Sequence, residues 1–263
     1  MDTFFIAGSQ RSGTTLLSVM LDRHPNIHIG NDALAFRMIS CFNLYKDILP
    51  YNLEYSREEL QSWLIENDYK GRMKALLDYK DIKSYPDARS LLKNGIENRL
   101  QETGKSVFGD KAPNIEYFMR DLLTLIPEAK FIHIIRDGRS AALSWNVRAY
   151  KTLYLAAQEW VDSNTLGLAN QSLVGDKVYK IVKYEDLLLK PIETMREICS
   201  FLNVDFDSAM VTEEENQNDE KQYVKSQLDV SKIDSYKSKL TKWQISKIEK
   251  IQSPLLKRFN YEL

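Results

Sequence analysis

A glycine-spaced loop near the start of the chain, Gly8-Ser9-Gln10-Arg11-Ser12-Gly13-Thr14-Thr15, constrains the fold more than any other feature of the sequence. The apolar run at 3–7 that precedes the loop predicts a buried strand, and the pattern at 14–21 predicts a helix. Glycines at 8 and 13 allow backbone N–H groups to converge on an anion at the N-terminus of that helix. The sequence therefore predicts a phosphate-binding loop between a strand and a helix.

One position of this loop narrows the kind of phosphate group that it can hold. Nucleoside-triphosphate loops place a lysine where this chain has Thr14, and that lysine reaches the β- and γ-phosphates. Here the positive charge lies inside the loop, on Arg11. The forked guanidinium of an arginine suits bidentate contacts with a diphosphate-like group. We therefore expect a ligand other than a magnesium-bound triphosphate, and no metal site.

The size and charge of the chain limit the classes of protein to consider. Its 263 residues, with 43% hydrophobic side chains, fit one α/β domain that spans 1–263. The formal net charge of −1 gives no support for a nucleic-acid partner, which would call for a basic face. The first strand begins by residue 3, and no apolar run approaches the ~18 residues of a membrane span. We therefore expect a cytoplasmic protein, unless the chain is a trimmed form of an anchored one.

Further along the chain, predicted strands alternate with predicted helices. Strands are expected at 27–30, 107–109, 130–135 and 178–182, and helices at 115–126, at 140–171 in one or two pieces, and at 192–202. This alternation predicts an α/β, P-loop-type three-layer fold with a mostly parallel central sheet. The stretch at 33–104 is mostly helical in pattern, and we expect it to form an inserted helical cap.

A second candidate anion site follows the strongest predicted strand, at 130–135. This strand ends in Arg136-Asp137-Gly138-Arg139, and Ser144 lies on the helix that begins there. An arginine at the carboxyl end of a strand can meet a phosphate that a serine on the helix shares. Arg148, one helical turn after Ser144, could join the same phosphate or could be a solvated residue. Arg136 could also simply pair with Asp137.

Taken in order, these motifs resemble the family of sulfotransferases that use 3′-phosphoadenosine 5′-phosphosulfate. The resemblance rests on the two anion motifs and on further segments at Leu21-Asp22-Arg23-His24-Pro25, Gly109-Asp110-Lys111-Ala112-Pro113, Lys183-Tyr184-Glu185-Asp186-Leu187 and Phe259-Asn260-Tyr261. The order of the motifs is most similar to the branch that includes tyrosylprotein sulfotransferases and many bacterial relatives. The predicted cap lies outside the matching segments.

The resemblance implies a role for each matching position. The loop residues Arg11, Ser12, Gly13, Thr14 and Thr15 would hold the 5′-phosphosulfate of the donor. The 3′-phosphate would be bound by Arg136, Ser144 and Arg148, with Lys237 or Lys239 closing on it. Tyr184 would contact the donor, or it could be an ordinary residue at the edge of the core. Arg11 and Lys111 would stabilise charge on the leaving oxygen, although Lys111 could instead pair with Asp110.

The resemblance also suggests a general base. The tyrosylprotein branch uses a glutamate shortly after the glycine that follows the His-Pro turn, and this chain has Gly30-Asn31-Asp32 at that point. A partly desolvated Asp32 could take the proton of an acceptor hydroxyl, or it could cap the helix predicted to follow. His28 is the reserve candidate. His133, inside the strongest strand, is expected to be structural.

The resemblance therefore implies transfer of a sulfuryl group to a hydroxyl of an acceptor. The acceptor could be a peptide tyrosine, a carbohydrate or a small molecule, and a homodimer is compatible with the sequence. Two other functions share the fold: a P-loop kinase-like nucleotide enzyme, and a nucleotide-binding module without catalysis. The missing loop lysine argues against the first, and detection of sulfate on an acceptor would exclude the second.

Overall fold

The computed structural model describes residues 2–31, 88–111, 114–149, 152–212 and 229–263. Within these ranges the strands form a five-stranded sheet in the order β2-β3-β1-β4-β5, and each neighbouring pair is parallel. The strands are β1 (Asp2–Ala7), β2 (Ile27–Asn31), β3 (Val107–Lys111), β4 (Lys130–Ile135) and β5 (Tyr179–Lys183). The predicted α/β class with a parallel central sheet is confirmed.

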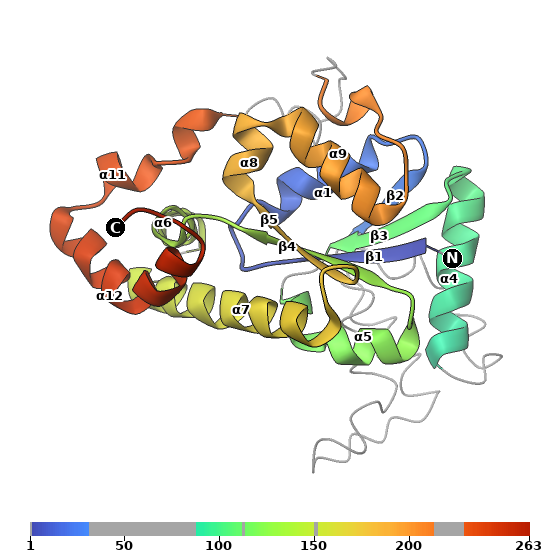
Figure 1. Cartoon of the computed structure of the whole chain (residues 1–263), viewed down its shortest axis with the longest axis horizontal. Helices are drawn as coiled ribbons and strands as arrows, with labels where there is room; N and C mark the ends of the chain where they lie inside the picture. Colours follow the sequence, from blue (N-terminus) through green and yellow to red (C-terminus); the bar gives the residue numbers. More distant parts are fainter. Residues whose placement is uncertain (1, 32–87, 112–113, 150–151, 213–228) are drawn as a thin grey trace, which may run out of the picture.

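Helices cover both faces of the sheet and complete the three layers (Figure 1). One face carries α1 (Thr14–Asp22), α8 (Tyr184–Leu189) and α9 (Pro191–Leu202), and the other carries α5 (Met119–Leu125) and α7 (Leu153–Val174). Beyond the carboxyl end of β4 lie α6 (Gly138–Ala149), α11 (Ser235–Lys239) and α12 (Lys242–Arg258). Short 3-10 helices occur at η2 (Ile115–Phe118), η3 (Ser208–Met210) and η4 (Val230–Lys232).

The central strands are apolar on both faces because helices cover both. Phe4 and Ile6 of β1 pack in the same buried cluster as Leu17 of α1. Phe5, between them, points to the opposite face, where its ring centroid lies 5.4 Å from that of Phe131. Because β1 pairs in parallel with both β3 and β4, the segments that follow these three strands meet at one edge of the sheet.

The helices differ from the sequence prediction at two places that bear on the loops. The helix expected at 115–126 starts with the 3-10 turn η2, after Asn114 in the left-handed region with a φ of 64°. A further helix, α8, begins at Tyr184 directly after β5, where the sequence pattern had indicated only the end of a strand. The stretch expected at 140–171 resolves into α6 and α7.

Most of the predicted cap at 33–104 lies outside the described residues. The described part is α4 (Ala88–Thr103), which packs beside β3 and buries Leu92, Ile96 and Leu100. No helix within the described ranges is both long and apolar enough to cross a membrane.

Candidate functional site

The first anion loop closes at the carboxyl end of β1, next to β4. Gly8 and Gly13 have φ angles of 134° and 104°, which glycine adopts without strain. Arg11 also has a positive φ, of 70°. A Cβ atom at Gly8 would overlap the carbonyl oxygen of Ile134, so the loop lies directly against β4. The backbone therefore needs both glycines where the sequence has them.

Hydrogen bonds between residues of this loop stabilise its conformation. The hydroxyls of Ser9 and Ser12 share a hydrogen bond of 2.6 Å, and the Ser12 N–H donates to the Ser9 carbonyl at 3.2 Å. Helix α1 begins at Thr14, so its first N–H groups lie at the loop. Thr14 is half-buried and Thr15 is exposed. The geometry suits an anion at the helix N-terminus, and the phosphate-binding role stays a prediction.

A buried carboxylate supports the same loop from the other side of the sheet. The Gly8 N–H donates to Glu116 Oε2 at 3.3 Å, and the Ser163 hydroxyl of α7 donates to Glu116 Oε1. The Asn170 side chain donates to the Glu116 carbonyl at 2.8 Å. Sequence reasoning missed Glu116 because it lies 108 residues from Gly8 within a segment that resembled an ordinary amphipathic helix.

Arg136, at the start of the second loop, is a buried cation that is 7% exposed. Its Nη2 donates to the carbonyl of Lys232 at 2.6 Å, and its Nη1 donates to the carbonyl of Arg11 at 3.3 Å. Its Nε is buried and has no hydrogen-bond partner in the part of the chain that the structure describes. Burial lowers the pKa of this guanidinium, and neighbouring acidic groups oppose the shift, so Arg136 stays protonated. A buried cation with an unpaired donor fits an anionic ligand here.

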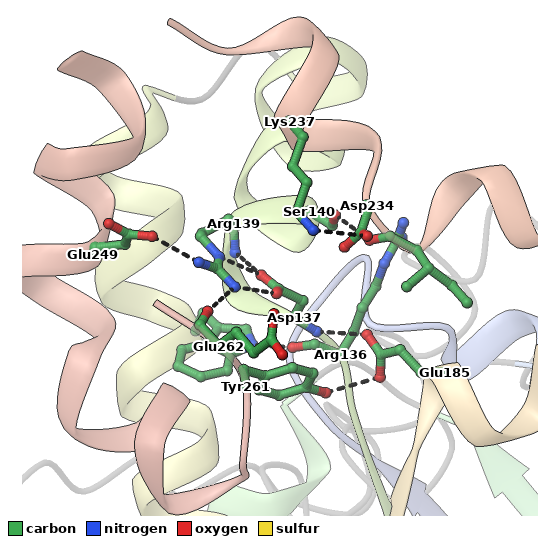
Figure 2. Close-up of polar contacts among 12 residues, drawn as sticks. Arg136, Asp137, Arg139, Ser140, Glu185, Asp234, Lys237, Glu249, Tyr261 and Glu262 are labelled. Carbon is green, nitrogen blue, oxygen red and sulfur yellow. Dashed lines mark hydrogen bonds and ion pairs between the residues drawn. The ribbon is translucent and has the colours of Figure 1, made fainter. Parts of the chain in front are cut away.

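Asp137 pairs with Arg139 and not with Arg136, so the ion pair considered in the sequence analysis is wrong. Arg139 Nη2 lies 2.7 Å from Asp137 Oδ2, and Arg139 Nε donates to Oδ1 at 3.0 Å. The same guanidinium donates to Glu249 of α12 and to the carbonyl of Glu262, both at 2.6 Å (Figure 2). Burial alone would lower the pKa of Arg139, but the hydrogen bonds and charges of Asp137 and Glu249 raise it above its ordinary value. Asp137 is thus already paired with Arg139, and the Arg136 guanidinium forms no ion pair with it.

Besides the bond from Arg136 to the Arg11 carbonyl, two further contacts join the first loop to the second. Arg11 Nε donates to Ser144 Oγ at 3.3 Å. The Tyr184 ring lies 4.5 Å from the guanidinium carbon of Arg136, and a Cβ atom at Gly13 would overlap the same ring. The structure therefore brings together Arg11, Gly13, Arg136, Ser144 and Tyr184, and their role in binding the donor stays a prediction.

The residues expected to act on the transferred sulfuryl group lie in, or directly after, strands β2 and β3. Lys111 is the last residue of β3, half-buried, and pairs in register with Ile6 of β1 and Asn31 of β2. Asp32, the candidate base, lies outside the described residues, directly after Asn31. His28 is near the amino end of β2, 4.0 Å from Asp22, and burial lowers its pKa. The structure does not bring His28 to the two loops.

Three further candidates complete the predicted set. Arg148 lies on α6, one turn after Ser144, and its side chain is outside the description. Lys237 of α11 is exposed and pairs with Asp234 at 2.9 Å, and Lys239 on the same helix is exposed as well. Within the described ranges no cluster of His, Cys, Asp and Glu side chains is arranged to hold a metal ion.

The fold is that of an α/β protein with two loops at the carboxyl edge of a parallel sheet, the position where such folds bind ligands. Residues 3–208 match the model of the sulfotransferase family. The chain therefore belongs to the sulfotransferase family.

It is 26% identical over 242 residues to protein-tyrosine sulfotransferase of Drosophila melanogaster, covering 82% of this chain and 40% of the relative. It is 26% identical over 234 residues to protein-tyrosine sulfotransferase 1 of Danio rerio, covering 82% of this chain and 57% of that protein. The chain spans about half the length of these relatives.

Solved sulfotransferase structures share the fold. The sulfotransferase domain from the curacin biosynthetic pathway aligns with a TM-score of 0.66 at 24% identity, covering 99% of this chain and 98% of that one. The sulfotransferase domain from the Synechococcus PCC 7002 olefin synthase aligns with a TM-score of 0.64 at 23% identity, covering 99% and 94%. Mouse sulfotransferase SULT7A1, complexed with PAP, aligns with a TM-score of 0.52 at 13% identity, covering 97% and 85%.

Proposed function

We propose that this sulfotransferase takes its sulfuryl group from 3′-phosphoadenosine 5′-phosphosulfate and transfers it to a hydroxyl of an acceptor. The observation that carries the proposal is the pairing of two cationic loops at one sheet edge, joined by the 3.3 Å contact between Arg11 Nε and Ser144 Oγ. A donor with two separated anionic groups would fill both loops. The Nε of Arg136, buried and without a hydrogen-bond partner among the described residues, supports an anion at the second loop. Family membership and a structural neighbour complexed with PAP favour the same donor.

In this proposal each loop binds one end of the donor. The 5′-phosphosulfate is bound by Arg11, Ser12, Gly13, Thr14 and Thr15. The 3′-phosphate is bound by Arg136 and Ser144, with Arg148 joining from the next turn of α6. Tyr184 contacts the donor from between the loops, a position supported by its packing on Gly13 and Arg136.

The transfer breaks the bond between sulfur and the bridging oxygen of the donor, and it forms a bond between sulfur and the acceptor oxygen. Negative charge develops on the bridging oxygen, where Arg11 and Lys111 stabilise it. The acceptor proton passes to the base, for which Asp32 is our candidate. Support for this pairing comes from the register of β2 and β3, because Asn31, the residue before Asp32, pairs with Lys111.

The acceptor is proposed only as a hydroxyl compound. The relatives named as protein-tyrosine sulfotransferases make a tyrosine-containing peptide the first acceptor to test. Carbohydrate and small phenol or alcohol acceptors belong in the same panel, since a sulfuryl group needs only a nucleophilic oxygen in line with it.

Donor binding and transfer can be tested separately. We expect 3′-phosphoadenosine 5′-phosphate to raise the melting temperature of the chain more than ADP or Mg²⁺-ATP does, because only the first has a 3′-phosphate. A larger shift with Mg²⁺-ATP would overturn the assignment and favour a kinase-like enzyme. Incubation with donor carrying labelled sulfate should then label an acceptor from the panel. Binding with no transfer to any acceptor would favour a nucleotide-binding module.

A further inference from the structure

We propose that Glu185 and Tyr261 are positioning residues for the second anion loop: they hold the backbone of Arg136 in the orientation that receives the 3′-phosphate. The inference rests on the proposed donor. It adds two side chains that do not touch the donor themselves, and it gives the segment at 259–262 a part in donor recognition.

The peptide group between Arg136 and Asp137 is held at both of its polar atoms by side chains from other elements. Its carbonyl oxygen accepts from Trp160 Nε1 of α7 at 3.0 Å. Its N–H, on Asp137, donates to Glu185 Oε1 of α8 at 2.9 Å (Figure 2). All of these groups are buried, so each partner fixes the rotation of this peptide more firmly than a solvent contact would.

The same short segment of α8 also holds the Arg136 side chain. Tyr184, the residue before Glu185, places its ring under the Arg136 guanidinium. One dipeptide therefore orients both the backbone and the charged group of Arg136. A rotation of Glu185 would change the direction in which the guanidinium leaves the loop.

Tyr261 holds the other oxygen of Glu185. Its hydroxyl donates to Glu185 Oε2 at 2.8 Å, and its own N–H donates to the carbonyl of Leu256 at the end of α12. The next residue, Glu262, accepts from Arg139 through its carbonyl (Figure 2). The segment at 259–262 is thus bound directly to Arg139, which follows β4, and to Glu185, which follows β5 and accepts from the Asp137 N–H.

Losing the Tyr261 hydroxyl should therefore loosen Glu185 specifically. A buried carboxylate oxygen that loses its donor must find another partner, and the nearest route is to rotate away from the Asp137 N–H. Arg136 would then lose part of its fixed orientation while the loop at 8–15 keeps its own. The expected defect is in 3′-phosphate recognition and not in binding of the 5′ end.

Isothermal titration of the full chain with 3′-phosphoadenosine 5′-phosphate and with adenosine 5′-monophosphate measures this defect, since the two ligands differ only by the 3′-phosphate. The wild type should prefer the bisphosphate. Tyr261→Phe should weaken binding of the bisphosphate by about five- to tenfold and leave binding of the monophosphate unchanged. The ratio of the two affinities should therefore fall by the same factor. In kinetic assays the donor KM should rise more than kcat falls.

Matched variants separate positioning from general destabilisation. Glu185→Ala should reduce the preference for the bisphosphate over the monophosphate at least as much as Tyr261→Phe does. Glu185→Gln should largely retain this preference, because the amide oxygen can accept from the Asp137 N–H and the amide nitrogen can donate to the Tyr261 hydroxyl. Tyr179→Phe is the control: it removes a buried hydroxyl that contacts His133 at 2.8 Å, and it should leave the preference intact.

Two results would overturn the positioning role. One is a Tyr261→Phe protein that keeps the wild-type preference, and the other is an equal loss of affinity for both ligands. A wild-type chain that binds the two ligands equally would instead refute the proposed donor, before any variant is considered.

Discussion

The two anion loops lie at the same edge of the sheet but are held in place by different means. The loop at 8–15 takes its shape from its own backbone, with positive φ angles at Gly8, Arg11 and Gly13. The loop that follows β4 is held by partners remote in sequence, among them Trp160, Glu185 and the carbonyl of Lys232. The first loop thus depends mainly on the backbone conformation of a short segment, with Glu116 as a remote support, whereas the second depends on partners from several other elements.

This difference predicts different failures. A change inside the first loop should act through steric overlap and backbone strain, so it should cost stability with or without ligand. A change in the second loop should act through a missing partner for a charged ligand, so it should appear mainly in donor affinity.

Gly8→Ala should produce the largest effect. The added Cβ would overlap the carbonyl of Ile134, and the φ of 134° is strained for any other residue. We expect the free energy of unfolding to fall by about 4 kcal/mol, from strain and overpacking together, as measured by urea unfolding. Gly104→Ala is the control, since Gly104 has a φ of 66° but no heavy atom within 4 Å of the new Cβ. It should cost only about 1 kcal/mol, and equal losses would argue against a sterically determined loop.

Arg136→Ala should have the next largest effect, and on binding. Losing a charge-assisted partner of a phosphate costs about 1.5–3 kcal/mol, which weakens affinity by about 10- to 150-fold. Titration with 3′-phosphoadenosine 5′-phosphate measures the loss. The affinity of Arg136→Lys should lie between those of the alanine variant and the wild type, because lysine keeps the positive charge but not the forked guanidinium. Arg23→Ala removes an arginine that donates to Thr212 at 2.8 Å, and it should leave affinity unchanged. Unchanged affinity in Arg136→Ala would refute the second site.

The same contrast explains how much of the fold could be predicted from the sequence. Strands buried on both faces have continuous apolar runs, so 130–135 could be located to the residue. Helix α8 could not, because its six residues are too few for a periodic pattern and begin without a break after β5. Local pattern therefore identified the sheet and most helices, but not the short helix that carries Tyr184 and Glu185.

The residues of the site also differ in how far the sequence could predict them. Arg11, Gly13, Arg136, Ser144 and Tyr184 lie in short motifs, and the structure brings them together. The contacts that support these residues join segments far apart in the sequence: Glu116 is 108 residues from Gly8, and Tyr261 is 76 residues from Glu185. No local pattern indicates such contacts, which depend on how the layers pack.

Tyr184→Leu should have a smaller effect that involves both loops. The leucine would lose the ring stacked on Arg136 and the surface that packs on Gly13. Loss of the cation–π contact alone is worth about 1 kcal/mol, or about fivefold in affinity for 3′-phosphoadenosine 5′-phosphate. Tyr184→Phe keeps the ring and should bind almost as the wild type does. If Tyr184→Phe and Tyr184→Leu lose affinity for 3′-phosphoadenosine 5′-phosphate equally, the Tyr184 hydroxyl, and not its ring, is the group that links the two loops.

The smallest effect should be a pH dependence of stability that arises at Glu185, the residue of α8 that supports the second loop. Burial raises the pKa of Glu185 above its ordinary value of 4.5, although hydrogen bonds from the backbone and from Tyr261 oppose the shift. Between the ordinary and the raised pKa, the folded chain binds a proton that the unfolded chain has released, so the free energy of unfolding falls as the pH rises. The Glu185→Gln variant has no such proton at this position. In urea unfolding over a pH series, its stability relative to the wild type should therefore grow from about pH 4.5 upward and level off above the folded pKa of Glu185. A difference that stays constant across the series would mean that Glu185 is no more costly to ionise in the folded chain than in water.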